Sequence, residues 1–385
     1  MLPLSVQAES VSILISRNGK GKQWLSITAF VLSFFSIVSL YADVSSLTGA
    51  PLRTLLKPKA VFKRTSLVKS RLLIFNKSNT IHPQVEIKTE NERKFAKNYD
   101  EYRATSTDKE IFIIDLDKTE PPLNFLYEKL TLVTSFSENH FQEGLGFIGS
   151  AQQQMPNKTI IVYDLGLKEH SSNQIRSFCN VQLRRFPFES YPAHLKTLAT
   201  YAFKPTIINL VLNEFGVIYY GDASIRFKKP LFELLPDCVN HHGFLGQIRC
   251  FDPKVLKSKY GCRHDYGLTK EEIYGKIGVN KTEYYNANFS SPAISGGLML
   301  VINSSSVQSK IMRPWLSCAL DVTCIAPHGA NLGNHRFDQS ALSLIAFKNM
   351  RGEWTLENDP TPHHNAVVSV LRGSNGAKWR PQSCS

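Results

Sequence analysis

The feature that most restricts the fold is an alternation of short apolar runs with longer amphipathic stretches between residues 130 and 227. Strands followed by helices in this order are typical of an α/β domain with a mostly parallel sheet. Hydrophobic residues make up 42% of the chain, which is enough for a substantial core. The predicted strands are 111–116, 130–136, 159–167, 180–188 and 217–227, and the predicted helices are 140–155, 170–178 and 191–216.

Ligands of open α/β sheets bind beyond the carboxyl ends of the strands, so the residues that follow each strand are the first candidates for a site. Ser135, Asp164 and Asp222 occupy such positions. Asp222 could hold a divalent cation against a diphosphate, and Arg226 could meet phosphate oxygens. Alternatively, Asp222 only turns the chain after its strand, as aspartate often does.

The ordered segments resemble the nucleotide-sugar transferases of the GT-A fold, especially the family-eight-like retaining enzymes. LTLVTSF, a helix and TIIVYDLGL look like the half of the domain that receives the nucleotide. VIYYGDAS looks like the strand that ends in the metal-binding Asp-x-Asp motif. AISGGLMLVIN looks like the glycine-bearing strand at the donor sugar, and HRFDQSALSLI looks like the helix start that carries Asp-Gln.

The resemblance covers roughly residues 110–380 and implies a GT-A-like, Rossmann-type mixed sheet, mostly parallel and flanked by helices. It implies a nucleotide-sugar donor and a glycan or protein acceptor as partners. Asp338 and Gln339 would then be catalytic, although Asp338 could instead cap its helix. The residues expected to bind the nucleotide or donor are Asp164, Asp222, Ser224, Arg226, Gly296, Gly297, Arg372 and Lys378.

Two departures from the family pattern concern the metal. Ser224 stands where the second acid of the Asp-x-Asp motif is expected, and Arg372 stands where a metal-binding histidine is expected. The resemblance implies Mn²⁺ or Mg²⁺ held by Asp222, with His364 or its neighbour His363 as the nearest replacement ligand. Alternatively, Arg372 neutralises the diphosphate directly and takes over part of the work of the metal.

A closer likeness is to a group of animal single-pass membrane proteins that is numerous in nematodes. The shared segments are YDLGL, YAFKP, DAS-x-R and HR-x-DQSAL. This likeness bears on fold and topology more than on chemistry.

An uncharged apolar stretch at residues 24–42 has the length of a bilayer-spanning helix. Basic residues before it favour a type II orientation, with a cytoplasmic tail at 1–23, a basic stem at 43–105 and a lumenal domain at 106–385 in the Golgi or endoplasmic reticulum. A cleaved signal peptide is the rival interpretation. The basic run of the stem has no accompanying nucleic-acid motif, so no nucleic-acid partner is expected.

The sequons and cysteines fit an oxidising lumen. Five tripeptides match the acceptor pattern for N-glycosylation. The seven cysteines show no zinc-type spacing, so disulfides are expected, with Cys318 and Cys324 as the best local pair. The predicted glycan sites are Asn76, Asn157, Asn280, Asn288 and Asn303.

Two functions therefore compete. The first is a glycosyltransferase that moves a sugar from a nucleotide-sugar donor to a hydroxyl acceptor. The second is a catalytically inert GT-A-like module that binds a glycan or protein. Loss of one motif acid favours the second function, and the retained Asp-Gln segment favours the first.

Overall fold

The chain divides into two compact units, residues 1–69 and 70–385, which are described separately. The structure is a computed structural model. It describes residues 9–16, 22–29, 112–116, 121–248, 267–287, 291, 293–351, 359–373 and 379–384.

The larger unit is built on a six-stranded sheet in the order β5-β4-β3-β6-β9-β8. The first four strands of this order are parallel, whereas β9 runs antiparallel to both of its neighbours. This mixed, mostly parallel sheet confirms the predicted fold class. The strands are β3 (Leu130–Phe136), β4 (Ile160–Asp164), β5 (Val181–Arg185), β6 (Val217–Gly221), β8 (Phe244–Ile248) and β9 (Ile294–Ile302).

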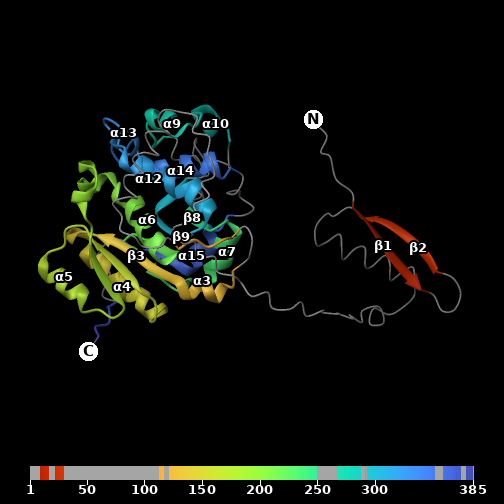
Figure 1. The fold of residues 1–385 in the computed structure, drawn as a ribbon, viewed down its shortest axis with the longest axis horizontal. Helices are drawn as coiled ribbons and strands as arrows, with labels where there is room; N and C mark the ends of the chain where they lie inside the picture. Colours follow the sequence, from red (N-terminus) through yellow and green to blue (C-terminus); the bar gives the residue numbers. More distant parts are fainter. Residues whose placement is uncertain are drawn as a thin grey trace, which may run out of the picture. The chain divides into compact units, whose positions relative to one another are not determined.

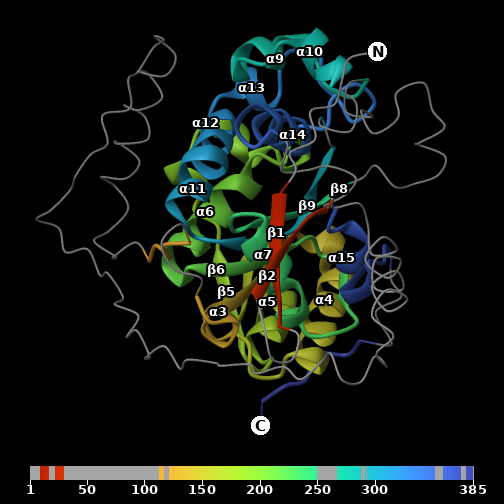
Figure 2. The ribbon, with the colours of Figure 1, turned by 90° about the vertical axis from the view of Figure 1, so that its right-hand side faces the viewer.

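Helices cover both faces of the sheet, as the alternating sequence pattern predicts (Figures 1 and 2). One face packs against α6 (Phe203–Phe215), α12 (Arg313–Leu320) and α14 (Asp338–Asn349), and these elements share one hydrophobic core. The other face packs against α3 (Leu123–Lys129), α4 (Phe141–Gln154) and α7 (Leu235–Asn240) around a second core. The sheet therefore separates two sets of buried side chains.

Smaller elements complete the unit. A two-stranded sheet pairs β7 with β10, so the chain that follows the turn after β6 is joined to a segment near the C-terminus. The C-terminus itself lies beside α4 and α5 (Figure 1). These elements are α5 (Glu169–Arg176), β7 (Ile225–Phe227), α9 (Glu271–Ile277), α10 (Lys281–Asn286), α11 (Ser305–Val307), α13 (Val322–Ile325), α15 (Thr361–Val367) and β10 (Val368–Val370).

Three predicted elements differ from the structure. Residues 112–116 form no strand, although Ile114 N–H donates to the carbonyl of Asn303 at the end of β9. The predicted helix over 191–216 is an α-helix only from Phe203, because Tyr201 has a left-handed backbone (φ 54°) that breaks the preceding short turns. The predicted strand over 217–227 is two strands, β6 and β7, with residues 222–224 between them.

The smaller unit contains an antiparallel pair, β1 (Glu9–Ser16) and β2 (Lys22–Ala29). The described part of the predicted membrane span, residues 24–29, is therefore extended, which suits its β-branched residues. Residues 30–42 and the predicted stem at 43–105 lie outside the described residues. None of the helices in the described part of the chain combines the length and hydrophobicity that a bilayer span requires.

Candidate functional site

The direction of the strands changes between β6 and β9, and Asp222 stands at this point. β6 ends at Gly221, so Asp222 is the first residue beyond the carboxyl end of the strand. Its backbone N–H donates to the carbonyl of Gly297 in β9 at 2.8 Å. This bond fixes Asp222 at the edge where ligands of open α/β sheets bind.

Lys204 is the residue that sequence reasoning misses. It is the second residue of α6, and its Nζ lies 2.7 Å from Asp222 Oδ1 and 3.7 Å from Asp338 Oδ2. The side chains of Lys204 and Asp338 are 7% and 5% exposed, whereas that of Asp222 is 37% exposed. One ammonium thus links two carboxylates from distant parts of the chain. The only sequence signal for it is a lone charge in the apolar segment YAFKPTIINLVL.

The charges of this cluster depend on one another. Burial opposes the charge of Lys204, but Asp222 and Asp338 outweigh it and hold the pKa of Lys204 above its usual value. Lys204 is therefore protonated at neutral pH. Burial raises the pKa of Asp338 to about 6, with Lys204 acting against the rise and Asp222 adding to it. The cluster thus combines a permanent cation with a carboxyl group that titrates close to neutral pH.

Gly296 and Gly297 give both carboxylates room beside β9. A Cβ on Gly296 would lie 2.3 Å from Asp338 Oδ2, and a Cβ on Gly297 would lie 2.5 Å from Asp222 Oδ2. Both distances are shorter than non-bonded atoms tolerate, so a side chain at either position would push a carboxylate out of its place. The glycine pair that the family resemblance assigned to the donor sugar therefore lines the carboxylate cluster.

Asp338 is held by its backbone more than by its side chain. It is the first residue of α14, and the N-cap position belongs to Phe337, which provides no side-chain cap. The indole Nε1 of Trp315 donates to the carbonyl of Asp338 at 3.0 Å. Asp338 Oδ2 has no hydrogen-bond partner among the described residues, and the following residue, Gln339, is 8% exposed. Phe337 therefore holds the N-cap position, so the alternative that Asp338 caps its helix is wrong. Asp338 Oδ2 is the oxygen that faces Lys204.

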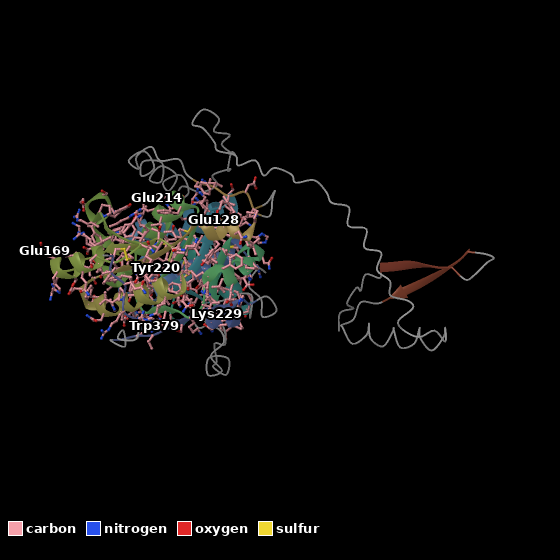
Figure 3. The ribbon with its side chains drawn as sticks, turned by 90° about the horizontal axis from the view of Figure 1, so that it is seen from below. Glu128, Glu169, Glu214, Tyr220, Lys229 and Trp379 are labelled. Carbon is pink, nitrogen blue, oxygen red and sulfur yellow. A yellow bond between two sulfur atoms is a disulfide. The ribbon has the colours of Figure 1, made fainter. Side chains whose placement is uncertain are left out.

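Tyr220 extends the cluster toward the neighbouring strand β3. Its hydroxyl lies 3.0 Å from Ser135 Oγ and donates to Asp222 Oδ1 at 3.4 Å. Tyr220 is fully buried, and Figure 3 labels it near the middle of the domain among the side chains drawn as sticks. Burial holds the pKa of Tyr220 above its usual value, so its hydroxyl stays a proton donor. The polar network therefore reaches from the end of β3 to the start of α14.

Asp164, the other predicted strand-end acid, serves its own loop. Its Oδ1 accepts the backbone N–H groups of Gly166 and Leu167 at 2.8 and 2.7 Å, and its Oδ2 accepts the hydroxyl of Ser172 at 3.3 Å. These contacts hold the turn between β4 and α5. The structure does not bring Asp164 into contact with Asp222 through any described interaction.

Arg226 does not reach toward a ligand. Its side chain is buried, and its Nη1 donates to the carbonyls of Ala223 and Ile225 at 2.7 and 2.8 Å. Its guanidinium occupies the space beside Gly146 in α4, where a Cβ would lie 2.3 Å away. The prediction that Arg226 binds phosphate from solvent is therefore wrong in this conformation. Ser224 is also buried, at 5% exposure.

Arg372 lies on an exposed segment that is anchored beside the Asp222 turn. The backbone N–H of Leu371 donates to the carbonyl of Ser224 at 2.7 Å, and that of Gly373 donates to Glu143 in α4 at 2.6 Å. The side chain of Arg372 is exposed between these two anchors. The segment that carries Arg372 is therefore attached both to the turn that follows β6 and to α4. Lys378 lies outside the described residues.

His364 does not join the carboxylate cluster. It is fully buried, its Nε2 lies 3.0 Å from the hydroxyl of Tyr219, and burial lowers its pKa to about 3. Tyr219 and Tyr220 are consecutive residues of β6, so their side chains point to opposite faces of the sheet. The prediction that His364 completes a metal site with Asp222 is wrong, because the sheet lies between the two side chains.

The residues present do not fit a resident divalent cation at Asp222. Among the described residues, no group of three or more His, Cys, Asp or Glu side chains could hold a metal ion. Lys204 already occupies one oxygen of Asp222. A divalent ion about 5 Å from that ammonium would meet a repulsion of about 7 kcal/mol at an effective dielectric constant of about 20.

Two of the predicted glycan sites are accessible in the structure and one is not. Asn157 and Asn280 are exposed, and Asn280 lines a surface hollow of about 470 Å³ along α10. Asn303 is fully buried, and its Nδ2 donates to the carbonyls of Phe112 and Leu212. A glycan on Asn303 is incompatible with this packing. Asn76 and Asn288 lie outside the described residues.

The cysteines form two disulfides in the described part of the chain. Cys318 and Cys324 form the local bond that their spacing predicts. Cys179 bonds to Cys384, and Gln152 in α4 holds the same C-terminal segment by exchanging hydrogen bonds with the backbone of Gln382. The C-terminal segment is therefore fastened across α4, on the side of the sheet opposite Lys204.

Comparisons with known proteins give the following likenesses. A family model described as a protein of unknown function (DUF1647) matches residues 89–209, a segment that contains Lys204 and ends before Asp222. No curated protein matches the sequence.

Among solved structures, the apo WbbM bifunctional glycosyltransferase superposes with a TM-score of 0.37 at 14% identity, over 57% of this chain and 38% of that chain. The galactosyltransferase LgtC, in complex with donor and acceptor sugar analogs, superposes with a TM-score of 0.36 at 12% identity, over 63% of this chain and 87% of that chain. Mouse xyloside xylosyltransferase 1, in its apo form, superposes with a TM-score of 0.36 at 12% identity, over 57% of this chain and 82% of that chain. The matched region spans less than half of the WbbM protein, and TM-scores this low do not establish a shared fold.

Proposed function

We propose that the chain is a glycosyltransferase that moves a sugar from a nucleotide-sugar donor to a hydroxyl of a glycan or protein acceptor. The observation that carries the proposal is the ion-paired cluster of Lys204, Asp222 and Asp338 at the carboxyl edge of the sheet. Buried charges are costly, and perturbed ionisable groups gather at functional sites more often than elsewhere.

The chemistry of glycosyl transfer suits this arrangement. The departing nucleoside diphosphate is anionic, and fixed cations at its position lower the barrier. Arg372, on the exposed segment beside the Asp222 turn, supplies such a cation. The sugar carbon develops positive charge in the transition state, and an ionised carboxylate stabilises it. Asp338 is ionised above about pH 6 and keeps one oxygen without a hydrogen-bond partner.

Thermal unfolding of the full-length chain with a panel of nucleoside diphosphates and nucleotide sugars tests the proposal. A ligand that binds the folded state raises the melting temperature by mass action, without knowledge of the acceptor. We expect one nucleotide to raise the melting temperature of the wild type and of Asp164→Asn, and to raise that of Arg372→Ala less. No rise with any member of the panel would sink the transferase proposal.

An inert binding module is the second candidate, and the burial of Ser224 in place of a motif acid favours it. Turnover separates the two functions. A transferase releases sugar slowly to water when it is given only its donor, whereas an inert module binds the donor and leaves it intact. We expect free sugar to accumulate with the wild type and to fall at least tenfold with Asp338→Asn, a loss of about 1.4 kcal/mol or more.

A type II membrane topology with a lumenal domain remains part of the proposal. The uncharged stretch at 24–42, the basic residues before it and the exposed sequons at Asn157 and Asn280 support it. Glycosidase treatment of protein expressed in animal cells checks the side of the membrane. We expect a mobility shift that is lost when Asn157 and Asn280 are both replaced by Gln. Release of the chain from membranes by alkaline carbonate would contradict the anchor.

A further inference from the structure

We propose that the ammonium of Lys204 takes the place of a divalent cation in this site, so that the nucleoside diphosphate binds without a metal ion. The inference deepens the proposed function and rests on it for the identity of the ligand. The placement of Lys204 between Asp222 and Asp338 carries it.

Lys204 is built into the site by the fold. It lies in the first turn of α6, and its Nζ stands 4.8 Å from the centre of the Tyr201 ring, which is a cation–π contact. The ammonium therefore faces two carboxylates and one aromatic ring. With its side chain 7% exposed, it has little room to swing away and leave the space to a hydrated metal ion.

The other positions that would hold a metal are used otherwise. Ser224 offers a neutral hydroxyl where a second acid is expected, and it is buried. His364 bonds to Tyr219 on the opposite face of the sheet. Asp222 is left as the one partly exposed carboxylate, and its Oδ1 is already paired with Lys204. A single carboxylate beside a fixed ammonium is a poor site for Mn²⁺ or Mg²⁺.

The charge balance explains how an anion can enter. Two ionised carboxylates alone would repel a diphosphate, and a metal ion is the usual way to cancel them. Here Lys204 cancels one of the two charges permanently. Below about pH 6 the second charge is reduced by protonation of Asp338. Arg372, exposed beside the Asp222 turn, is then available to the phosphate oxygens themselves.

Thermal unfolding with metal alone tests the inference without any nucleotide. The melting temperature of the full-length wild type should be the same in excess EDTA and in about 1 mM Mn²⁺, since only a bound metal shifts it. Lys204→Met removes the cation but keeps the length of the side chain. We expect its melting temperature to be lower and to recover in part with Mn²⁺, because two carboxylates are left without a partner.

Two further variants show whether the recovery comes from this site. Lys204→Met with Asp222→Asn should lose the recovery. Lys158→Met is the matched control, because Lys158 also lies over an aromatic ring, that of Tyr127 at 4.0 Å, and interacts with one carboxylate, that of Glu128, instead of two. Its melting temperature should not respond to Mn²⁺. A wild-type melting temperature that rises with Mn²⁺ and falls with EDTA would overturn the inference.

Calorimetric titration of the wild type with the nucleotide that raises its melting temperature, in EDTA and in Mn²⁺, tests whether the nucleotide binds without a metal ion. We expect the two dissociation constants to agree within about twofold. A tenfold weaker affinity in EDTA would overturn the inference and leave the transferase proposal intact. No binding in either buffer would sink the transferase proposal, while the metal titration would still decide whether Lys204 excludes the cation.

Discussion

Asp164 and Asp222 both stand at the carboxyl ends of parallel strands of one sheet, yet the structure uses them differently. Asp164 is the last residue of β4, and Asp222 is the first residue beyond β6. Asp164 accepts two backbone N–H groups and a hydroxyl within eight residues of itself. Asp222 is paired with Lys204 from another element and leaves its own turn to backbone bonds. The comparison teaches that the position after a strand identifies candidates, and that the partners decide which candidate belongs to a site.

The largest expected effect concerns Asp338, the acid that joins Asp222 across Lys204. Burial raises its pKa from 3.8 to about 6. Between these values the folded state binds more protons than the unfolded state, so the free energy of unfolding falls as pH rises. A difference of about two units between the two pKa values corresponds to about 3 kcal/mol in the free energy of unfolding. This contribution is present below the unfolded-state pKa and is lost above the folded-state pKa. Asp338→Asn cannot titrate, and it should remove this part of the decline between about pH 4 and pH 6.

Urea unfolding of the wild type and Asp338→Asn at several pH values measures the decline. Ser343→Ala is a control in the same helix, because it loses the hydrogen bonds to the carbonyl of Gln339 and from the backbone N–H of Ile294 but no charge. It should lower the free energy of unfolding equally at every pH and keep the wild-type decline. If the free energy of unfolding declines equally with pH in the wild type and in Asp338→Asn, then Asp338 has the same pKa in the folded and unfolded states.

The next effect is Asp222→Asn, which keeps the shape of the side chain and removes its charge. Lys204 is buried and would lose its closest anion, so we expect the free energy of unfolding to fall by about 2 kcal/mol. The partial exposure of Asp222 keeps the loss below that of a fully buried pair. Chemical unfolding at neutral pH measures it. A change below about 0.5 kcal/mol would mean that the ion pair contributes little in solution.

The same substitution at Asp164 sharpens the comparison. Asn keeps the oxygen that accepts the N–H groups of Gly166 and Leu167, so Asp164→Asn should change the free energy of unfolding by less than about 0.5 kcal/mol. Asp164→Ala removes the acceptor and should cost about 1–2 kcal/mol. Neither variant should weaken nucleotide binding. Weaker binding in Asp164→Asn would place this acid in the site and break the distinction.

The sequence predicts the parts of this fold that rest on local pattern. The apolar runs at 130–136 and 217–221 are strands in the structure, because each lies buried in the middle of the sheet where no polar face is needed. Asp222 is predicted from its place after such a strand, and Gly296 and Gly297 from the resemblance of their segment to the glycine-bearing strand of the family. They do meet at one edge of the sheet.

What the sequence misses depends on contacts between distant segments. Lys204 and Asp338 lie on different helices, and no spacing rule brings a lysine from one helix beside an acid of another. Arg226 is predicted to face a ligand from its place just beyond Asp222, and His364 as a replacement for the histidine of the family pattern. Their orientation instead follows the two-residue alternation of the strands to which they bond, which places His364 on the opposite face from Tyr220. A shift by one residue in either strand would reverse these assignments.

Arg372 gives the smallest expected effect on stability and tests the outer border of the site. Its side chain is exposed, so Arg372→Ala should change the free energy of unfolding by less than about 0.5 kcal/mol. If the Arg372 side chain contacts the diphosphate, Arg372→Ala should bind nucleotide about tenfold more weakly, a loss of about 1.4 kcal/mol in binding free energy. Arg380→Ala, another exposed arginine of the C-terminal region, is the control and should bind as the wild type does. Equal binding in both variants would confine the site to Lys204, Asp222 and Asp338, whose charges would then have to receive the diphosphate without an outer cation.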